Sequence, residues 1–221
     1  MCGIAGIISD NLNESINIKL VEEMTNSLVH RGPDGCGIFH DRGVGLGHRR
    51  LSIIDIDGGH QPMSSNDRNV TVTYNGEIYN FQKLRKELQS LGCQFKTKSD
   101  TEVIIHAYQE WGIESVKKFD GMFAFALWDR SYSRLFLVRD RMGVKPLYWT
   151  KIKNKLVFAS ELKAILSDPD FNRGVNLNAL SSYLTFRQAV GDIAFFDGIK
   201  KLMPGHYMIC ENGNILIKKY Y

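Results

Sequence analysis

The chain alternates between blocks of strand-like and helix-like hydrophobic pattern. Short apolar or alternating runs, typical of buried strands, occur at residues 3–8, 37–40, 44–48, 51–56 and 70–74. Further strands are expected at residues 122–128, 135–139, 147–150 and 156–159. A final hairpin is predicted to pair residues 206–210 with 215–219 around Asn212-Gly213, which is a strong turn signal.

Apolar residues at helical spacing separate these blocks of strands. They predict helices at residues 18–28, 81–91, 101–111, 161–166 and 177–186. Asn17, Asn80 and Asp100 stand at the positions expected for N-caps. The order of elements lacks the strict alternation of a parallel doubly wound sheet, so it favours antiparallel sheets covered by helices.

Composition adds only that the chain folds as a globular domain. Its 221 residues include 28 Lys and Arg against 24 Asp and Glu, a net charge of +4. This charge is too small and too dispersed to predict a nucleic-acid or membrane-surface partner. Because domains average about 150 residues, the length favours one large domain or one with a short appendage. The pattern is interrupted only at residues 167–173, and no apolar stretch is long enough to span a bilayer.

The four cysteines are widely spaced, at Cys2, Cys36, Cys93 and Cys210. An even count is compatible with two disulfides, but such spacing in a chain of this length favours reduced thiols. There is no CxxC pair, no histidine at zinc spacing and no HExxH motif. We therefore expect a cytoplasmic protein without a metal site.

Cys2 is a candidate nucleophile because the initiator methionine is commonly removed before a small residue. Removal would place a thiol and a free α-amine on one residue. An α-amine titrates near pH 8 (about 7.7–8.0), so it could accept the thiol proton. The alternative is a small buried core residue, and position alone favours that alternative.

Acyl chemistry at a thiol also needs donors for the oxyanion, and Asn75-Gly76 offers them after the strand at residues 70–74. Asparagine brings a side-chain amide, and glycine brings an unencumbered backbone N–H. The local alternative is a type I′ hairpin turn. That turn would be cramped, because only about three residues remain before the expected helix cap at Asn80.

Charged residues supply candidate substrate contacts. Arg49 and Arg50 follow a glycine-rich strand, and alternation would turn one of them inward, where it could bind a carboxylate through two hydrogen bonds. For most such pairs, solvated side chains are the better interpretation. Asp100 could cap a helix, bind a substrate ammonium, or do both. Lys145 and the charged residues at 139–141 and 200–201 are expected to be solvated or to form internal ion pairs.

Together these residues lie in motifs that resemble a known family. The motifs are MCGIAG (1–6), HRGPDG (30–35), GHRRLSIID (47–55), GGHQPM (58–63), YNGEIYN (74–80), SDTE (99–102), DGMFAFA (120–126), RDR (139–141), GVKPLY (143–148) and FASELK (158–163). They resemble the glutaminase domain of class II glutamine amidotransferases, most closely that of glutamine-hydrolysing asparagine synthetases. The match is dense over residues 1–165 and looser over residues 166–221, so the resemblance treats residues 1–221 as one domain.

The resemblance implies an α+β fold of the N-terminal-nucleophile hydrolase type. This fold is a four-layer α/β/β/α sandwich with two antiparallel sheets, in agreement with the predicted element order. The resemblance also implies catalytic roles. Cys2 would attack the side-chain carbonyl of glutamine with its own α-amine as base, and Asn75 and Gly76 would hold the oxyanion.

The resemblance implies a glutamine pocket as well. Arg50 would bind the α-carboxylate of L-glutamine, while Arg49 occupies a position that varies in the family. Asp100 would bind the α-ammonium. The pocket would be completed by the backbone around Leu51 and Ile53 and by Glu77.

In asparagine synthetases this domain is followed by an ATP-dependent synthetase domain, whose Ser-Gly-Gly-x-Asp-Ser loop does not occur in this chain. We therefore expect a domain or fragment without a cofactor of its own, with ATP and magnesium confined to a synthetase domain that is its partner in cis. A homodimer is compatible with the resemblance. Two alternatives stay open: the amidotransferase domain of a sugar-modifying relative with another ammonia acceptor, and a non-catalytic module that keeps the fold for regulation or dimerisation.

Overall fold

The computed structural model describes residues 1–221 and contains two six-stranded sheets, in which all paired strands are antiparallel. The first sheet is formed, in spatial order, by β10 (Lys200–Lys201), β8 (Tyr148–Ile152), β9 (Lys155–Ala159), β1 (Gly3–Ser9), β3 (Val44–Arg50) and β2 (Gly35–Asp41). The second is formed by β12 (Asn214–Lys219), β11 (His206–Glu211), β7 (Arg134–Arg139), β6 (Gly121–Asp129), β5 (Val70–Ile78) and β4 (Met63–Ser64).

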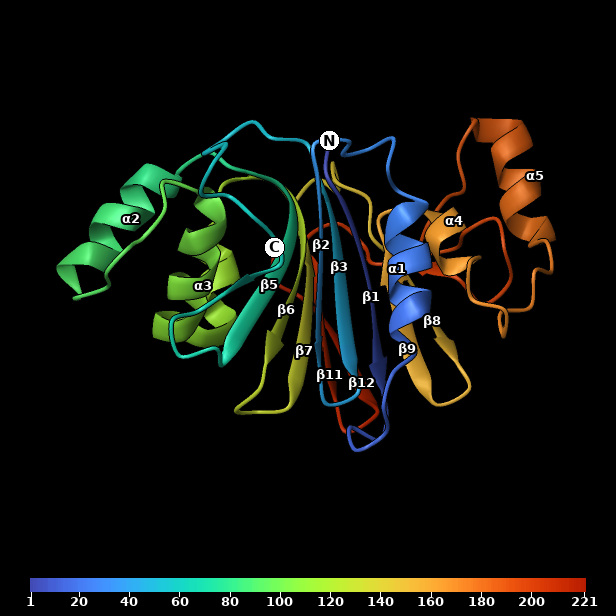
Figure 1. Ribbon diagram of the computed structural model, residues 1–221. Helices are drawn as coiled ribbons and strands as arrows, with labels where there is room; N and C mark the ends of the chain where they lie inside the picture. Colours follow the sequence, from blue (N-terminus) through green and yellow to red (C-terminus); the bar gives the residue numbers. More distant parts are fainter.

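Helices cover the outer sides of the two sheets, as Figure 1 shows. Those on the second sheet are α2 (Phe81–Ser90), α3 (Asp100–Trp111) and the 3-10 helix η1 (Gly112–Lys118). Those beside the first sheet are α1 (Ile18–Asn26) and α4 (Leu162–Ile165), with α5 (Leu177–Phe186) beyond α4. The architecture is the predicted four-layer α/β/β/α sandwich.

Three apolar clusters hold the layers together. One lies between the two sheets and includes Leu46 and Trp128. The others lie under α2 and α3 and under α1 and α4. All seven residues of β1 are buried in this arrangement. Because β1 is an inner strand of its sheet, the residues that precede it are held at the middle of one end of the molecule (Figure 1).

Most predicted elements are confirmed where the local signal is strong. Asn17 caps α1, and its side-chain oxygen accepts the Leu20 N–H at 3.3 Å. The predicted helix at residues 177–186 is α5, with Asn176 as its cap. The predicted last hairpin is β11 and β12, in which Glu211 pairs with Asn214 across the Asn212-Gly213 turn.

One predicted N-cap, Asp100, is wrong, and another, Asn80, stands at the N-cap position without a capping bond from its side chain. α3 is capped by Ser99, whose hydroxyl accepts the Thr101 N–H at 3.1 Å, so Asp100 is the first helical residue. Asn80 makes no capping bond to α2. Its amide instead donates to the Lys118 carbonyl at 2.8 Å and accepts from the Asp120 N–H at 3.1 Å. Tertiary partners therefore use the side chains that local sequence assigned to the helix ends.

The strand predicted at residues 51–56 is also wrong, and this segment is a loop. β3 ends at Arg50, and the Arg50 guanidinium donates to the carbonyls of Ile54, Asp55 and Ile56. These bonds curl the chain around one side chain, and Asp55 adopts a positive φ of 49°. The backbone carbonyls are satisfied by an arginine instead of a neighbouring strand.

Two general expectations can be compared with the structure. Cys2, Cys36, Cys93 and Cys210 are all free thiols, as their spacing predicted. None of the helices combines the length and the apolar character needed to cross a membrane.

Candidate active site

The predicted site residues from both sheets line one cavity of about 150 Å³. Cys2, at the start of β1, comes from the first sheet, together with Arg50 at the end of β3. Asn75 and Gly76, within β5, come from the second sheet. The cavity wall includes every residue that the sequence proposed for the site: Cys2, Arg50, Leu51, Ile53, Asn75, Gly76, Glu77 and Asp100.

The Cys2 thiol is fixed by backbone contacts with the loop that follows β3. The Leu51 N–H lies 3.4 Å from Cys2 Sγ, and the thiol lies 3.6 Å from the Leu51 carbonyl. Burial raises the pKa of the thiol, although the Leu51 contact and the charge of Arg50 act in the opposite direction. A half-buried thiol whose pKa is raised is protonated near neutral pH, so it needs a base before it can attack a carbonyl.

Arg31 holds the main chain of Cys2 from the other side. Its Nε donates to the Cys2 carbonyl at 2.9 Å, and its Nη1 donates to Glu161 Oε1 at 2.8 Å. The His30 ring also contacts Glu161, at 2.9 Å. Sequence reasoning used the two motifs that contain these residues only for the family resemblance and gave them no role. The structure shows that they hold the main chain of Cys2 in place.

Asn75 presents an unused donor to the cavity. The residue is only 1% exposed, and its Nδ2 is buried without a hydrogen-bond partner. A buried amide nitrogen without a partner is uncommon, because its desolvation is not compensated. Such a group is suited to bind an oxygen that carries negative charge only during the reaction.

Gly76 lies inside β5, and the hairpin turn considered for Asn75-Gly76 is not present. The strand continues to Ile78, and Gly76 pairs with Phe123 of β6. A Cβ at Gly76 would lie 2.2 Å from the Met122 carbonyl oxygen and 2.6 Å from Phe123 Cα. Glycine is therefore required here because the backbone of β6 approaches too closely for any side chain.

The edge of β5 that faces away from β6 supplies a second donor. The Tyr74 N–H donates to Gln61 Oε1 at 2.7 Å, and the Ile78 N–H donates to Asp100 Oδ2 at 3.1 Å. Backbone N–H groups two residues apart point to the same edge of a strand, so the Gly76 N–H lies between these two. No side chain accepts from it there, and Gly76 lines the cavity. Sequence reasoning missed Gln61 and Tyr74.

Asp100 is buried and bridges α3 to β5. Its Oδ2 accepts from the Tyr74 hydroxyl at 2.7 Å as well as from Ile78 N–H, which leaves Oδ1 for a ligand. Burial raises the pKa of the Asp100 carboxyl, while these two bonds act to lower it. Burial and the neighbouring carboxylate raise the pKa of Tyr74 well above its ordinary value, so the phenol remains a donor.

Arg50 and Arg49 point to opposite sides of β3, as strand alternation predicted. Arg50 is 7% exposed and lies in the cavity wall, whereas Arg49 is more exposed and binds Asn26 and the Thr25 carbonyl of α1. Arg50 uses three of its five N–H groups on the loop carbonyls, which leaves two for a ligand carboxylate. Ile53 is 64% exposed, so this loop forms the outer wall of the cavity.

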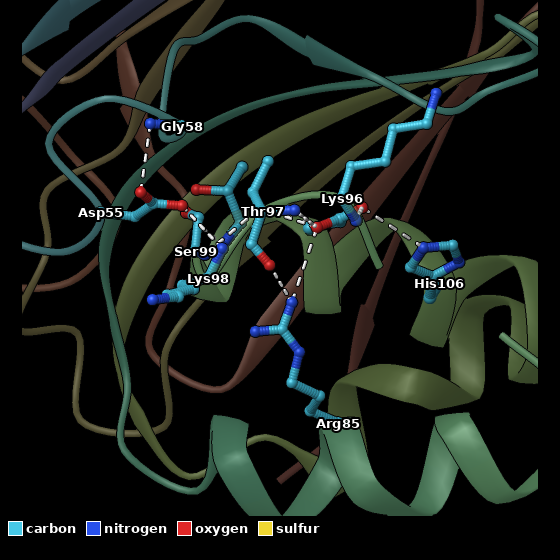
Figure 2. Close-up of polar contacts among 10 residues, drawn as sticks. Asp55, Gly58, Arg85, Lys96, Thr97, Lys98, Ser99 and His106 are labelled. Carbon is cyan, nitrogen blue, oxygen red and sulfur yellow. Dashed lines mark hydrogen bonds and ion pairs between the residues drawn. The ribbon is translucent and has the colours of Figure 1, made fainter. Parts of the chain in front are cut away.

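The same loop is tied to the segment before α3, as Figure 2 shows around Asp55. Asp55 Oδ2 accepts the Lys98 N–H at 2.6 Å, and Oδ1 accepts the Gly58 N–H at 3.1 Å. The two residues before Lys98 are held by Glu102, which accepts from the Thr97 N–H at 2.7 Å and the Lys96 N–H at 2.8 Å. The loop carries the backbone carbonyls that bind Arg50, and the start of α3 carries Asp100. These contacts therefore fix the two segments relative to each other.

Lys145 departs from its predicted environment. It is 4% exposed and lines the cavity, where we expected a solvated charge or an ion pair. Asp140 likewise is fully buried, and Arg139 donates to the carbonyls of Gly143, Lys145 and Leu202. Only Arg141 and Lys200 form predicted ion pairs, with Asp120 and Asp192. A single charged residue in a loop gives no local signal of burial, which is why the sequence missed Lys145.

The chain is a sandwich of two antiparallel sheets in which a cysteine precedes an inner strand and shares a cavity with two unused N–H donors. This is an N-terminal-nucleophile hydrolase architecture. The solved structure of a Bacillus subtilis glutamine phosphoribosylpyrophosphate amidotransferase supports this fold, with a TM-score of 0.72 over 100% of this chain and 49% of that chain, at 20% identity. The chain belongs to the glutamine amidotransferase domain family, whose model matches residues 1–221.

Curated relatives place the chain more narrowly within this family. It is similar to two Bacillus subtilis proteins, asparagine synthetase [glutamine-hydrolyzing] 3, with 39% identity over 224 residues, and asparagine synthetase [glutamine-hydrolyzing] 1, with 40% identity over 226 residues. Each match covers 100% of this chain but only 36% and 35% of the respective relative. The chain thus spans about a third of the length of these relatives.

Proposed function

We propose that this chain hydrolyses L-glutamine to glutamate and ammonia through a thioester on Cys2. The observation that carries the proposal is the shared cavity of the Cys2 thiol and the partnerless amide nitrogen of Asn75. The two groups come from different sheets, and the partnerless amide nitrogen is costly to bury. A nucleophile beside an unused oxyanion donor is the arrangement that acyl transfer requires.

The first half of the reaction forms the thioester. Removal of Met1, which also lines the cavity, would free the Cys2 α-amine to accept the thiol proton. Sγ then bonds to the side-chain amide carbon of glutamine, and the carbonyl oxygen becomes an oxyanion held by Asn75 Nδ2 and the Gly76 N–H. When this intermediate collapses, the carbon–nitrogen bond breaks and the α-ammonium gives its proton to the leaving nitrogen, which departs as ammonia.

The second half restores the enzyme. The α-amine accepts a proton from water as the water oxygen attacks the thioester carbon, and the same two donors hold the second oxyanion. The carbon–sulfur bond then breaks, the thiolate regains a proton, and glutamate leaves. One water is consumed, and no oxidant, reductant or metal takes part in these steps.

The cavity wall offers matching groups for the two charges at the other end of glutamine. Arg50 has two free N–H groups for the α-carboxylate, and Asp100 has a free oxygen for the α-ammonium. The loop backbone at Leu51 and Ile53, with Glu77, completes the wall. Glutamine has a neutral amide at one end and a zwitterion at the other, and this matches the distribution of charged groups along the cavity wall.

We further propose that the ammonia serves ATP-dependent asparagine synthesis from aspartate by a synthetase domain in the same polypeptide. The names and lengths of the relatives support this use. ATP and magnesium would bind in that domain, and the four free thiols fit a cytoplasmic location. A sugar acceptor for the ammonia is the competing use, and an assay of the longer polypeptide with aspartate and ATP, or with a sugar phosphate, separates the two.

The central test compares the parent chain with Cys2→Ala in an assay of glutamate released from L-glutamine. Cys36→Ala is the matched control, because Cys36 is exposed and lies outside the cavity. The proposal predicts that Cys2→Ala abolishes turnover and that Cys36→Ala retains it. A glutamine-like electrophile should modify Cys2 in the parent. Equal turnover by the parent and Cys2→Ala would overturn the proposal.

The intact mass of the parent chain tests the non-catalytic alternative. Glutamine hydrolysis requires a mass without Met1, since only then is the Cys2 nitrogen an amine. A retained methionine would leave a peptide nitrogen, which cannot act as the base. Retention together with absent turnover would indicate a module that keeps the fold without the chemistry.

A further inference from the structure

Lys145 carries a positive charge that no protein group compensates. It is 4% exposed, it lines the cavity that contains Cys2, and its ammonium makes no hydrogen bond or ion pair. A lysine side chain this little exposed is usually paired with an acidic group. Here the ammonium has no such partner, and the residue that carries it lines the cavity, so it is placed to act on groups inside the cavity.

The backbone at Lys145 is held by a network of hydrogen bonds around Asp140 and Arg139. The Asp140 carboxylate accepts the N–H groups of Lys145 at 2.9 Å, Val144 at 2.9 Å and Met142 at 3.0 Å. The Lys145 carbonyl accepts from Arg139 Nε at 2.8 Å. Arg139 also donates to the Gly143 carbonyl at 2.7 Å. These bonds from Asp140 and Arg139 fix the backbone of the loop that carries Lys145.

The same network connects Lys145 to the oxyanion side of the cavity. Asp140 Oδ2, which accepts from Lys145, also accepts the Phe123 N–H at 3.1 Å. Phe123 is the β6 partner of Gly76. Lys145 thus lies on the side of the cavity formed by β5 and β6, whereas Arg50 and Asp100 are assigned to the zwitterionic end of the substrate.

We propose that Lys145 is a positioning residue whose ammonium keeps the α-amine of Cys2 in the unprotonated form that accepts the thiol proton. The inference rests on the proposed function, because it assumes that Met1 is removed and that the amine acts as base. A nearby cation disfavours a second positive charge, so it lowers the pKa of an amine. Without this effect an α-amine, with a pKa of about 7.7–8.0, would be mostly protonated at neutral pH.

Several other charged and titratable groups face this amine, and they do not change when Lys145 is replaced. The cations are Arg31, on the Cys2 carbonyl, and Arg50. The anions are Glu77 and Asp100, and the titratable neighbours are Cys2 itself and Tyr74. The two arginines are bonded to backbone carbonyls or Glu161, and Asp100 is bonded to Tyr74 and Ile78. Lys145 is the cation of this group without a bonded partner.

The test replaces Lys145 with methionine, which matches the lysine side chain as far as Cε and removes the charged Nζ. Lys145→Arg is the matched control that keeps the charge, and Lys145→Gln is a second neutral variant in case methionine disturbs folding. The first readout is the pH dependence of acetylation at residue 2, measured by mass spectrometry in the Cys2→Ala background so that the thiol does not interfere. We expect the neutral variants to raise the pKa of the α-amine by roughly 0.5–1 unit and Lys145→Arg to leave it unchanged.

The second readout is the pH profile of kcat/KM for glutamine in chains that retain Cys2. Since kcat/KM reports the protonation state of the free enzyme, its acidic limb should move upward by the same roughly 0.5–1 unit in Lys145→Met. The variant would lose about 3–10-fold at pH 6.5 and approach the parent at pH 9, where the amine is neutral in both. A merely structural role would reduce kcat/KM by the same factor at every pH.

The two readouts separate failure of the inference from failure of the proposed function. An unchanged α-amine pKa in both neutral variants overturns the role of Lys145, whatever the activity. A raised α-amine pKa in a chain whose parent lacks turnover supports the electrostatic role and overturns glutamine hydrolysis. Loss of activity in Lys145→Arg equal to that in Lys145→Met would also overturn the inference, because the charge would then be irrelevant.

Discussion

The Asn75 side chain is buried in a way that lowers the stability of the fold. Its amide nitrogen is buried without a partner, although the surrounding strands satisfy their own backbone groups. Arg31 is a second case, since its Nη2 is also buried without a partner beside the Cys2 carbonyl. Native proteins keep few such groups. Of these two residues only Asn75 lines the cavity that contains Cys2, so its free donor is better explained by the proposed reaction than by stability.

Replacing Asn75 with alanine should separate its contribution to the reaction from its contribution to stability. We expect kcat for glutamine hydrolysis to fall by about 10²–10³, the usual effect of removing one oxyanion donor, with a much smaller change in KM. The melting temperature should change little, because the lost amide makes no hydrogen bond. Asn66→Ala, in an exposed turn, is the control and should leave both quantities unchanged. A fall confined to KM would assign Asn75 to substrate binding instead.

Elements whose signals are local were predictable, and elements decided by tertiary contacts were not. The helix at 177–186 and the hairpin around Asn212-Gly213 follow from periodicity, caps and turn residues, and both are present. The segment 51–56 has a strand-like composition, but it is a loop that curls around the Arg50 side chain. The hydrogen bonds of Arg50 to this loop cannot be predicted from the neighbouring sequence. The sequence Asn75-Gly76 is typical of a turn, but its pairing with β6 keeps it extended.

The candidate site was more predictable than these element boundaries. Cys2, Asn75, Gly76 and Asp100 were proposed from motifs, and the structure brings them to one cavity. The supporting groups were not found, because Gln61 and Lys145 matter only through contacts between distant segments. Reactive residues that lie within a motif can be predicted from one sequence. The residues that position them depend on packing between distant segments and cannot.

β3 and β5 illustrate a polar link between elements of different sheets. Thr73 of β5 donates its hydroxyl proton to the Gly47 carbonyl at 3.2 Å and accepts from His48 Nδ1 at 3.1 Å. Nδ1 therefore carries the imidazole proton, and Nε2 is buried without a partner. Burial, with a smaller contribution from Arg50, lowers the pKa of His48 to about 3. The link is built around a neutral histidine.

This link should make folding stability depend on pH. The unfolded chain protonates His48 below about pH 6.5, and the folded chain does so only near pH 3. Between these values the unfolded state binds one more proton, so stability falls as pH falls, by about 1.4 kcal/mol per pH unit. Urea unfolding at pH 7 and pH 5 should differ by about 2 kcal/mol more in the parent than in His48→Leu. The exposed His60→Gln variant should behave like the parent, and an equal pH response in His48→Leu would contradict the assignment.

At the scale of the whole molecule, the cavity lies where the two sheets meet. The first sheet contributes Cys2 and Arg50, and the second contributes Asn75 and Gly76. The apolar cluster between the sheets sets their separation, so no single layer carries a complete site. A substrate that contacts both walls adds a connection between the layers. Binding should therefore stabilise the molecule as one cooperative unit.

Thermal unfolding of Cys2→Ala with L-glutamine tests this consequence without turnover. Ligand at 100 times its dissociation constant adds about 2.7 kcal/mol to the free energy of unfolding. For a chain of this size the melting temperature should rise by roughly 5–10 °C, at about 2–4 °C per kcal/mol. D-glutamine exchanges the positions of the groups on the α-carbon, so it cannot reach Arg50 and Asp100 with the amide still at residue 2, and it should give a much smaller rise. Asp100→Asn in the same background should lose most of the response to L-glutamine, because it removes the charge opposite the α-ammonium. An equal rise with both enantiomers would show that the ligand binds outside the cavity formed by the two sheets.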